Sequence, residues 1–243
     1  MPQTIRLYIK ETISPEKIIT LSEEQTHYLR NVIKANKTTP ILCFDNQSGE
    51  FSAELLSLEK KQGLLKIIDQ TQKYQQCPDI WLLFAPLKKD KTDFVIEKAT
   101  ELGCCKIQPV ITQYTITKNV RLDRYIAQSI EAAEQCRRTD LPEIGNPQEL
   151  PKILSSWDKE RILYFMDESL ESKNFLTVLQ ESSTLKAAIL IGPEGGFSKT
   201  EQQLLKSQKY IKGATLGPRI LRAETAVTAA LSCWQLISGD WSK

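Results

Sequence analysis

Two glycine-bearing segments carry residue types suited to holding a ligand. Residues 191–197 read Ile-Gly-Pro-Glu-Gly-Gly-Phe, and residues 216–222 read Leu-Gly-Pro-Arg-Ile-Leu-Arg. Glycine tolerates positive φ and lets a ligand approach the backbone without a Cβ in the way. A tight turn would explain either segment alone. Because the two segments flank one helix and each follows an apolar strand, their pairing favours a shared ligand site.

The neighbouring elements are expected to bring both segments to one edge of a sheet. Residues 187–191 form a continuous apolar run, which is typical of a parallel strand buried on both faces. Ser198 and Glu201 have the spacing of a capping box, so a helix begins there, and we expect Gly213 to end it. Right-handed crossovers make neighbouring strands parallel, so both segments open at the same carboxyl edge.

Other ligand classes find less support in the sequence. The spacing of a phosphate-binding P-loop and the Rossmann fingerprint are both absent. The six cysteines contain no pair at the spacing of a zinc site, and His27 is the single histidine, so we predict no metal. A net charge of +2 gives no strong electrostatic signal for nucleic acid, and any RNA surface must come from local clusters.

The chain is expected to divide at a polar linker that precedes Pro78. Residues 1–72 contain short strand-like segments and one helix, which indicates a small β-rich domain. Residues 73–243 alternate apolar strands with helices, which predicts an α/β domain with a mostly parallel sheet. No apolar segment resembles a signal peptide or is long enough to span a bilayer, so we expect a cytoplasmic protein with reduced thiols and no membrane partner.

Four motifs follow one another along the chain. Two are the glycine-bearing segments with their continuations, residues 191–201 and 216–226. Two more lie upstream, Glu-Lys-Ala-Thr-Glu-Leu-Gly at residues 97–103 and Glu-Ala-Ala-Glu-Gln-Cys-Arg-Arg at residues 131–138. In sequence and order, these motifs resemble those of the RsmE-type 16S rRNA uridine-N3 methyltransferases of the SPOUT class, and the resemblance covers most of the chain.

The resemblance implies a SPOUT domain with a deep trefoil knot over residues 73–243, a PUA-like RNA-binding domain over residues 1–72, and a homodimer. It also implies S-adenosylmethionine as methyl donor. Apolar walls and a few polar anchors are the usual composition of such a site. The residues expected to hold the donor are Leu190, Ile191, Gly192, Pro193, Glu194, Gly195, Gly196, Leu216, Gly217, Pro218, Ile220, Leu221 and Arg222.

The reaction that the resemblance implies is methylation of N3 of one uridine in the decoding region of 16S rRNA, in the small ribosomal subunit. Arg222, and secondarily Arg219, would stabilise the developing uracil anion. Glu194 is the candidate proton acceptor, although its carboxylate could equally cap backbone amides of its own loop. A different RNA substrate and a non-catalytic RNA-binding assembly factor are the two alternatives.

Seven basic residues are candidates for RNA contact. Where relatives commonly carry an arginine and a glycine in a turn, residues 31–40 of this chain have no glycine but keep two lysines. For the other clusters, a solvated helix face is the alternative explanation. The candidates are Arg6, Lys34, Lys37, Lys88, Lys89, Arg137 and Arg138.

Overall fold

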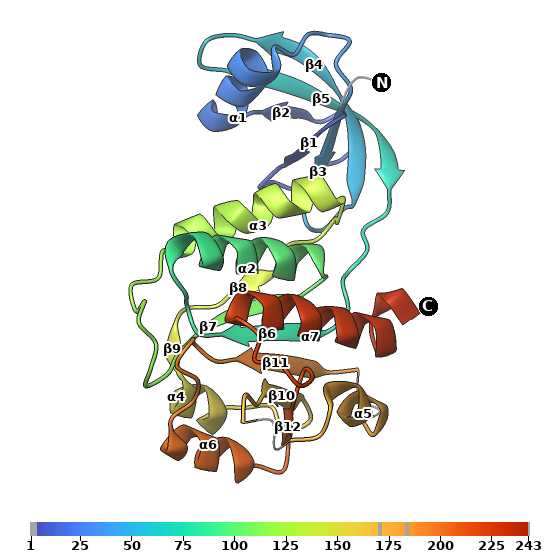
Figure 1. Ribbon diagram of the computed structural model, residues 1–243. Helices are drawn as coiled ribbons and strands as arrows, with labels where there is room; N and C mark the ends of the chain where they lie inside the picture. The colour runs from blue at the N-terminus through green and yellow to red at the C-terminus, as the bar shows by residue number, and fades with distance from the viewer. Residues whose placement is uncertain (1–3, 170–171, 183–184, 243) are drawn as a thin grey trace. The chain divides into compact units, whose positions relative to one another are not determined.

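The protein, in this computed structural model, consists of two compact units (Figure 1). The first comprises the chain up to Gln76 together with Ala133–Leu141, and the second comprises Cys77–Ala132 and the chain from Pro142 onwards. The structure describes residues 4–169, 172–182 and 185–242, so the outermost positions of the two predicted domains, 1–3 and 243, lie outside the described residues. Because the first unit includes Ala133–Leu141 as well as the start of the chain, it is not contiguous in sequence.

A five-stranded sheet with the order β1-β3-β4-β5-β2 forms the first unit. β1 pairs with β3 in parallel, and the other neighbours pair antiparallel. A short helix, α1 (Glu23–His27), begins at the predicted capping box of Ser22 and Gln25 and continues into a π-helix, Tyr28–Ile33. The strands are β1 (Ile5–Tyr8), β2 (Ile18–Thr20), β3 (Ile41–Phe44), β4 (Glu50–Leu58) and β5 (Gly63–Gln72).

A buried arginine attaches the returning segment Ala133–Leu141 to the sheet of this unit. Arg6 is only 8% exposed, and its Nε donates to Glu50 Oε2 at 2.6 Å. Its terminal nitrogens donate to three carbonyl oxygens, those of Ala133 at 2.6 Å, Glu134 at 3.1 Å and Arg138 at 3.1 Å. The guanidinium group therefore has a structural role that fixes two distant parts of the chain together.

The second unit contains a parallel sheet with the order β12-β10-β11-β6-β7-β8, in which β9 also pairs with β7. This confirms the predicted α/β class with a parallel sheet. Its strands are β6 (Ile80–Phe84), β7 (Lys106–Ile111), β8 (Glu143–Ile144), β9 (Gln148–Glu149), β10 (Ile162–Met166), β11 (Ala187–Ile191) and β12 (Ile211–Ala214).

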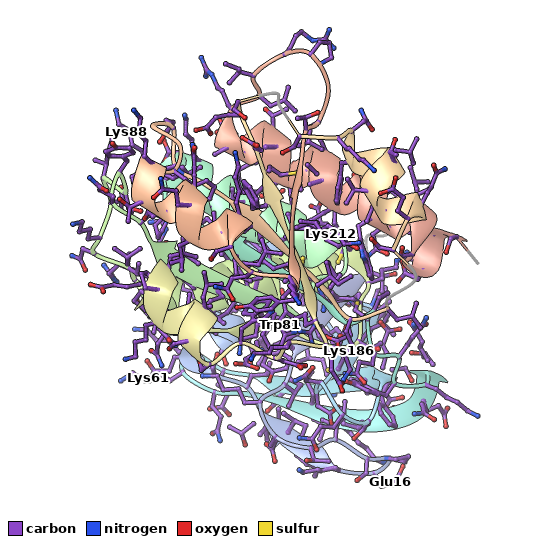
Figure 2. The ribbon with its side chains drawn as sticks, turned by 90° about the horizontal axis from the view of Figure 1, so that it is seen from below. Glu16, Lys61, Trp81, Lys88, Lys186 and Lys212 are labelled. Carbon is purple, nitrogen blue, oxygen red and sulfur yellow. The ribbon has the colours of Figure 1, made fainter. Side chains whose placement is uncertain are left out.

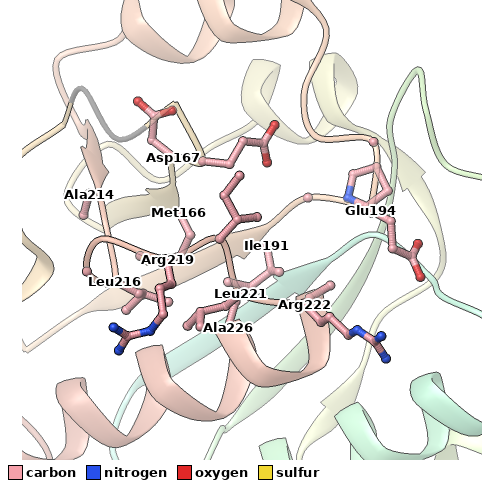
Figure 3. A pocket seen from close by; sticks show the side chains of 17 residues that line it. Met166, Asp167, Ile191, Glu194, Ala214, Leu216, Arg219, Leu221, Arg222 and Ala226 are labelled. Atoms are coloured by element: carbon pink, nitrogen blue, oxygen red, sulfur yellow. The ribbon is translucent and has the colours of Figure 1, made fainter.

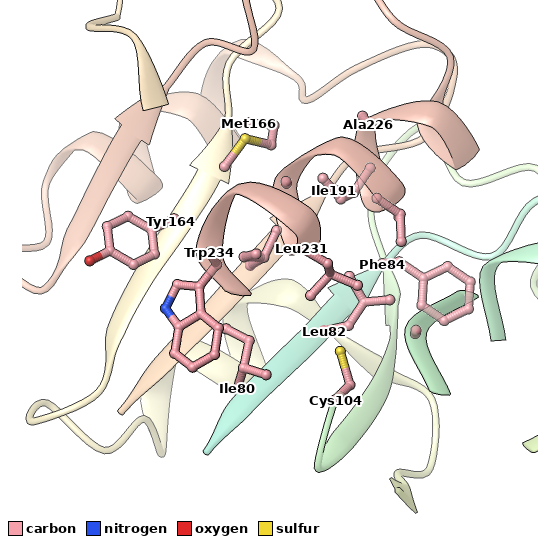
Figure 4. Packing of buried hydrophobic residues seen from close by; sticks show 14 of the residues in the cluster. Ile80, Leu82, Phe84, Cys104, Tyr164, Met166, Ile191, Ala226, Leu231 and Trp234 are labelled. Atoms are coloured by element: carbon pink, nitrogen blue, oxygen red, sulfur yellow. The ribbon is translucent and has the colours of Figure 1, made fainter. Parts of the chain in front are cut away.

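Both faces of this sheet are covered by apolar side chains. In β11, Ala187, Ile189 and Ile191 pack into one core, whereas Ala188 and Leu190 pack into another. Figure 4 shows the first core, where Trp234 and Leu231 lie against residues of β6.

The helices are α2 (Lys89–Glu101), α3 (Leu122–Cys136), α4 (Leu150–Ser155), α5 (Phe175–Gln180), α6 (Lys199–Lys206) and α7 (Ala223–Ile237), with a 3₁₀ turn at Asp240–Ser242.

The structure corrects two local expectations. β11 and β12 are parallel but not adjacent, because β10 pairs with both of them and lies between them. α6 begins after the predicted capping box but ends at Lys206, and Gly213 lies within β12. A Cβ at Gly213 would approach the ring of Phe165 to 3.0 Å, so glycine serves the packing of β12 on β10 rather than the end of the helix.

An aromatic and cationic cluster lies at the edge of the sheet where β6, β7 and β10 begin. The guanidinium carbon of Arg161 lies 3.9 Å from the centre of the Trp81 ring, and Lys106 Nζ lies 4.8 Å from it. Figure 2 labels Trp81, the residue on which this cluster is built. None of the helices in the described part of the chain has the length and apolar character needed to cross a membrane.

Candidate functional site

A pocket of about 390 Å³ opens where β10, β11 and β12 end (Figure 3). Parallel strands that finish at one edge make such a crevice, the usual ligand position in α/β sheets. The lining combines apolar side chains with acidic and basic ones. The lining residues are Met166, Asp167, Glu168, Ile191, Gly192, Pro193, Glu194, Gly195, Ala214, Leu216, Gly217, Arg219, Ile220, Leu221, Arg222, Ala223 and Ala226.

Both glycine-bearing segments reach this pocket. It is lined by Ile191, Gly192, Pro193, Glu194 and Gly195 from the first segment, and by Leu216, Gly217, Arg219, Ile220, Leu221 and Arg222 from the second. Three other residues that we expected at the site do not line it. Leu190 points into the core on the far face of the sheet, and Gly196 and Pro218 lie outside the lining. The structure thus brings together the three candidate catalytic residues, Arg222, Glu194 and Arg219.

Side chains pack closely against two glycines of the first segment. A Cβ at Gly192 would lie 3.1 Å from the ring of Phe197, which packs edge-on against Phe165. Gly196 has φ +68, and a Cβ there would overlap the carboxylate of Glu168 at 1.5 Å. Gly196 therefore needs glycine, because of its positive φ and the nearby Glu168 carboxylate, whereas a Cβ at Gly192 would make a tight contact with the Phe197 ring.

A lysine on α2 holds the carboxylate of Glu194. Lys91 Nζ lies 3.0 Å from Glu194 Oε1 and 3.6 Å from Glu224 Oε1, so it joins the first glycine-bearing segment to the first turn of α7. The hydrogen bond from Lys91 lowers the pKa of Glu194 and outweighs the opposing effect of desolvation. Glu194 is therefore ionised under ordinary conditions and already has a cationic partner.

Two further acids at the site were missed by the sequence analysis. Asp167 accepts hydrogen bonds from Ser169 N at 3.0 Å and Ser172 Oγ at 2.7 Å, and together they lower its pKa although burial raises it. Burial, and then the charge of Asp167, raise the pKa of Glu168, whose carboxylate accepts a hydrogen bond from the amide of Phe197. The signal was present, because both acids directly follow the apolar run that forms β10.

The residues predicted to contact RNA are distributed over both units. Lys34, Lys37 and Arg137 are exposed in the first unit, and Lys88 and Lys89 are exposed at the start of α2 in the second. Arg6 and Arg138 are buried in the first unit.

Arg138 donates from Nε to Asp140 Oδ1 at 2.9 Å. Because the guanidinium groups of Arg6 and Arg138 have partners within the unit, we remove both residues from the proposed RNA surface. Within residues 4–169, 172–182 and 185–242, no group of three or more metal-binding side chains is found.

The fold and the site match proteins of one class. A family model described as an RNA methyltransferase domain matches residues 74–235, which include both glycine-bearing segments and β6 to β12. The class is thus that of the RNA methyltransferases.

Relatives along the whole chain define the family within this class. The ribosomal RNA small subunit methyltransferase E of Rickettsia conorii is 31% identical over 96% of this chain and 95% of its own length. That of Buchnera aphidicola subsp. Schizaphis graminum is 31% identical over 98% of each. A solved structure of this enzyme from Neisseria gonorrhoeae, bound to S-adenosyl methionine, has a TM-score of 0.88 with 29% identity and covers 98% of this chain and 100% of that chain. The chain belongs to the ribosomal RNA small subunit methyltransferase E family of enzymes.

Proposed function

We propose that the protein transfers a methyl group from S-adenosylmethionine to N3 of a uridine in the decoding region of 16S rRNA, with the small ribosomal subunit as substrate. The observation that carries this proposal is the pocket built from both glycine-bearing segments. Its volume, about 390 Å³, is within the range of small-molecule sites, roughly 300–1,000 Å³. Its apolar lining suits the adenine ring, and its exposed backbone and charged groups suit the amino-acid part of the donor.

The donor supplies an electrophilic methyl group when it is bound. The N3–H proton of uracil must be removed, N3 then forms a bond to the methyl carbon, and the carbon–sulfur bond breaks with its electron pair remaining on sulfur. Glu194 would accept the proton, and Arg222, assisted by Arg219, would stabilise the negative charge on the uracil oxygens. Leu216, Ile220 and Leu221 would enclose adenine.

Several finer features belong to the same proposal. The second unit would contain the trefoil knot, the first would be a PUA-like RNA-binding module, and the enzyme would act in the cytoplasm as a homodimer. The exposed positions of Lys34, Lys37, Arg137, Lys88 and Lys89 support a role in phosphate contact. The strand order is in keeping with a knot, because the chain leaves β11 on one side of β10 and forms β12 on the other side.

The decisive experiment is transfer of labelled methyl from S-adenosylmethionine to purified small subunits that lack the modification, followed by mass spectrometry of the nucleosides. We expect N3-methyluridine at a single site. Transfer to tRNA or large-subunit rRNA instead would redirect the substrate assignment. Donor binding without transfer to any of these RNA classes would favour a non-catalytic assembly factor.

Replacing Glu194 by glutamine is expected to lower kcat by about 10²-fold at saturating donor, the low end of general acid–base effects, because Lys91 weakens the proton affinity of this carboxylate. A folded-state pKa below the usual value means that the carboxylate stays ionised as pH falls, until pH passes below that lowered pKa. The rate should therefore fall on the acidic side of the pH–kcat profile as Glu194 becomes protonated. Lys91→Met removes the group that lowers the pKa of Glu194, so this fall should occur at higher pH.

Glu224→Gln is the matched control. Glu224 also forms an ion pair with Lys91, but it lies on α7 and is not among the residues that line the pocket. We expect it to retain kcat within about threefold, a change of less than 1 kcal/mol. Near-normal kcat in Glu194→Gln would show that another group accepts the proton, and Glu168 would be the next residue to replace.

A further inference from the structure

An exposed tyrosine lies against the first glycine-bearing segment. Tyr114 follows β7 and is 47% exposed. A Cβ added at Gly195 would lie 3.3 Å from Tyr114 Cβ and 3.7 Å from its Cγ, so the glycine backbone packs against the base of the ring. Gly195 itself lines the pocket. The base of the aromatic ring therefore contacts the lining of the pocket, while about half of the residue's surface stays accessible.

The turn that carries Tyr114 is tightly anchored. Thr112 and Thr115, both buried, are joined by a hydrogen bond from Thr112 N to Thr115 Oγ1 at 2.8 Å and by their hydroxyl oxygens at 2.9 Å. Gln113 N donates to Glu201 Oε1 at 2.8 Å, and the other oxygen of Glu201 accepts from Ser198 N at 2.9 Å. The capping box of α6 thus connects the Tyr114 turn to the end of the glycine-bearing segment.

This arrangement suits one kind of ligand surface. A planar nucleobase stacks on an aromatic face, and alanine substitution of such a residue costs about 1–3 kcal/mol per base. A base must leave its helix before its Watson–Crick edge can react, and an unstacked base is commonly received by an aromatic side chain. Because hydrogen bonds already order the backbone of the turn, binding of a base would cost little additional conformational entropy of the protein.

We propose that Tyr114 is the stacking platform that receives the acceptor nucleobase at the mouth of the pocket. This proposal rests on the proposed function, since it assigns the position of the base that would be methylated. Tyr114 would hold the plane of the ring, and N3 would be presented towards the donor held by the two glycine-bearing segments.

The test compares Tyr114→Ala, Tyr114→Leu and Tyr114→Phe with the wild-type protein in methyl transfer to unmodified small subunits. We expect Tyr114→Ala and Tyr114→Leu to lower kcat/KM by about tenfold, within the range of one lost stacking contact. Tyr114→Phe should remain within about twofold, because it keeps the π face. Calorimetry should show the same Kd for S-adenosylmethionine in all four proteins.

Leucine is the matched control for ring removal, because it keeps apolar bulk without a π face. Equal kcat/KM in Tyr114→Leu and Tyr114→Phe would overturn the stacking role, and so would a weakened donor Kd in Tyr114→Ala. A second measurement, binding of a fluorescent single-stranded oligouridine, separates this proposal from the proposed function. If the wild-type protein transfers no methyl group, the reaction assignment fails, while oligouridine affinity that is unchanged in Tyr114→Ala overturns the platform itself.

Discussion

Replacing Arg222 by alanine is expected to lower kcat for methyl transfer by about 10²–10³-fold, the effect of removing one group that stabilises a developing anion. Arg222 lines the pocket, and its backbone is the N-cap of α7, so the free N–H groups of the first helical turn, which favour negative charge, begin at this residue. The backbone groups remain in the variant, but the full positive charge is lost. Single-turnover rates on unmodified small subunits would measure the loss.

Two variants show whether the effect arises from charge at this position. Arg222→Lys should recover part of the rate, because it keeps a cation but not the planar guanidinium group. Arg219→Ala removes an arginine from the same pocket lining and should lower kcat by about tenfold or less, a contribution of at most about 1.4 kcal/mol. A donor Kd that weakens in parallel with the rate of Arg222→Ala would instead make Arg222 a donor-binding residue.

Replacing Arg6 by alanine is expected to destabilise the first unit by about 3–5 kcal/mol, because removal of one member of a buried ion pair leaves the other charge uncompensated. The carboxylate of Glu50 is buried and would lose its cationic partner while keeping its hydrogen bond from Thr71. Three carbonyl oxygens would also lose their hydrogen bond from Arg6. Urea denaturation followed by circular dichroism would measure the change in the free energy of unfolding.

Arg137 provides the matched control for this prediction. It is an exposed arginine beside Arg138, so Arg137→Ala should change the free energy of unfolding by less than about 0.5 kcal/mol. Replacing both members of the buried pair, in Arg6→Met with Glu50→Leu, should restore part of the stability lost in Arg6→Ala, since no charge is then left unpaired. Equal stability of Arg6→Ala and Arg137→Ala would contradict the structural role of Arg6.

Local signals allowed much of the second unit to be predicted. The apolar run of β11 indicates burial on both faces, and its alternate side chains do enter two cores. The capping box at Ser198 and Glu201 starts α6 as predicted, because its hydrogen bonds join residues three apart. Gly213 shows the limit of such signals. A glycine can end a helix or admit a neighbouring ring, and only the packing of Phe165 decides between these roles.

Long-range contacts explain what the sequence could not indicate. An arginine is usually a surface residue, and nothing near Arg6 in the sequence indicates that its partners are Glu50 and the segment Ala133–Leu141. Likewise, the order of strands in a sheet depends on which crossovers pack best. The chain reaches β11 and β12 after β10, yet β10 lies between them and places Asp167 and Glu168 at the pocket.

The first unit is the first to be synthesised, but it needs the segment Ala133–Leu141, which is made much later. Arg6 leaves the ribosome early, but the carbonyl of Ala133 that it binds follows 127 residues later. The nascent chain must therefore carry an arginine without most of its partners while β6, α2, β7 and most of α3 emerge. Although its synthesis begins first, the first unit cannot be completed until more than half of the chain has been made.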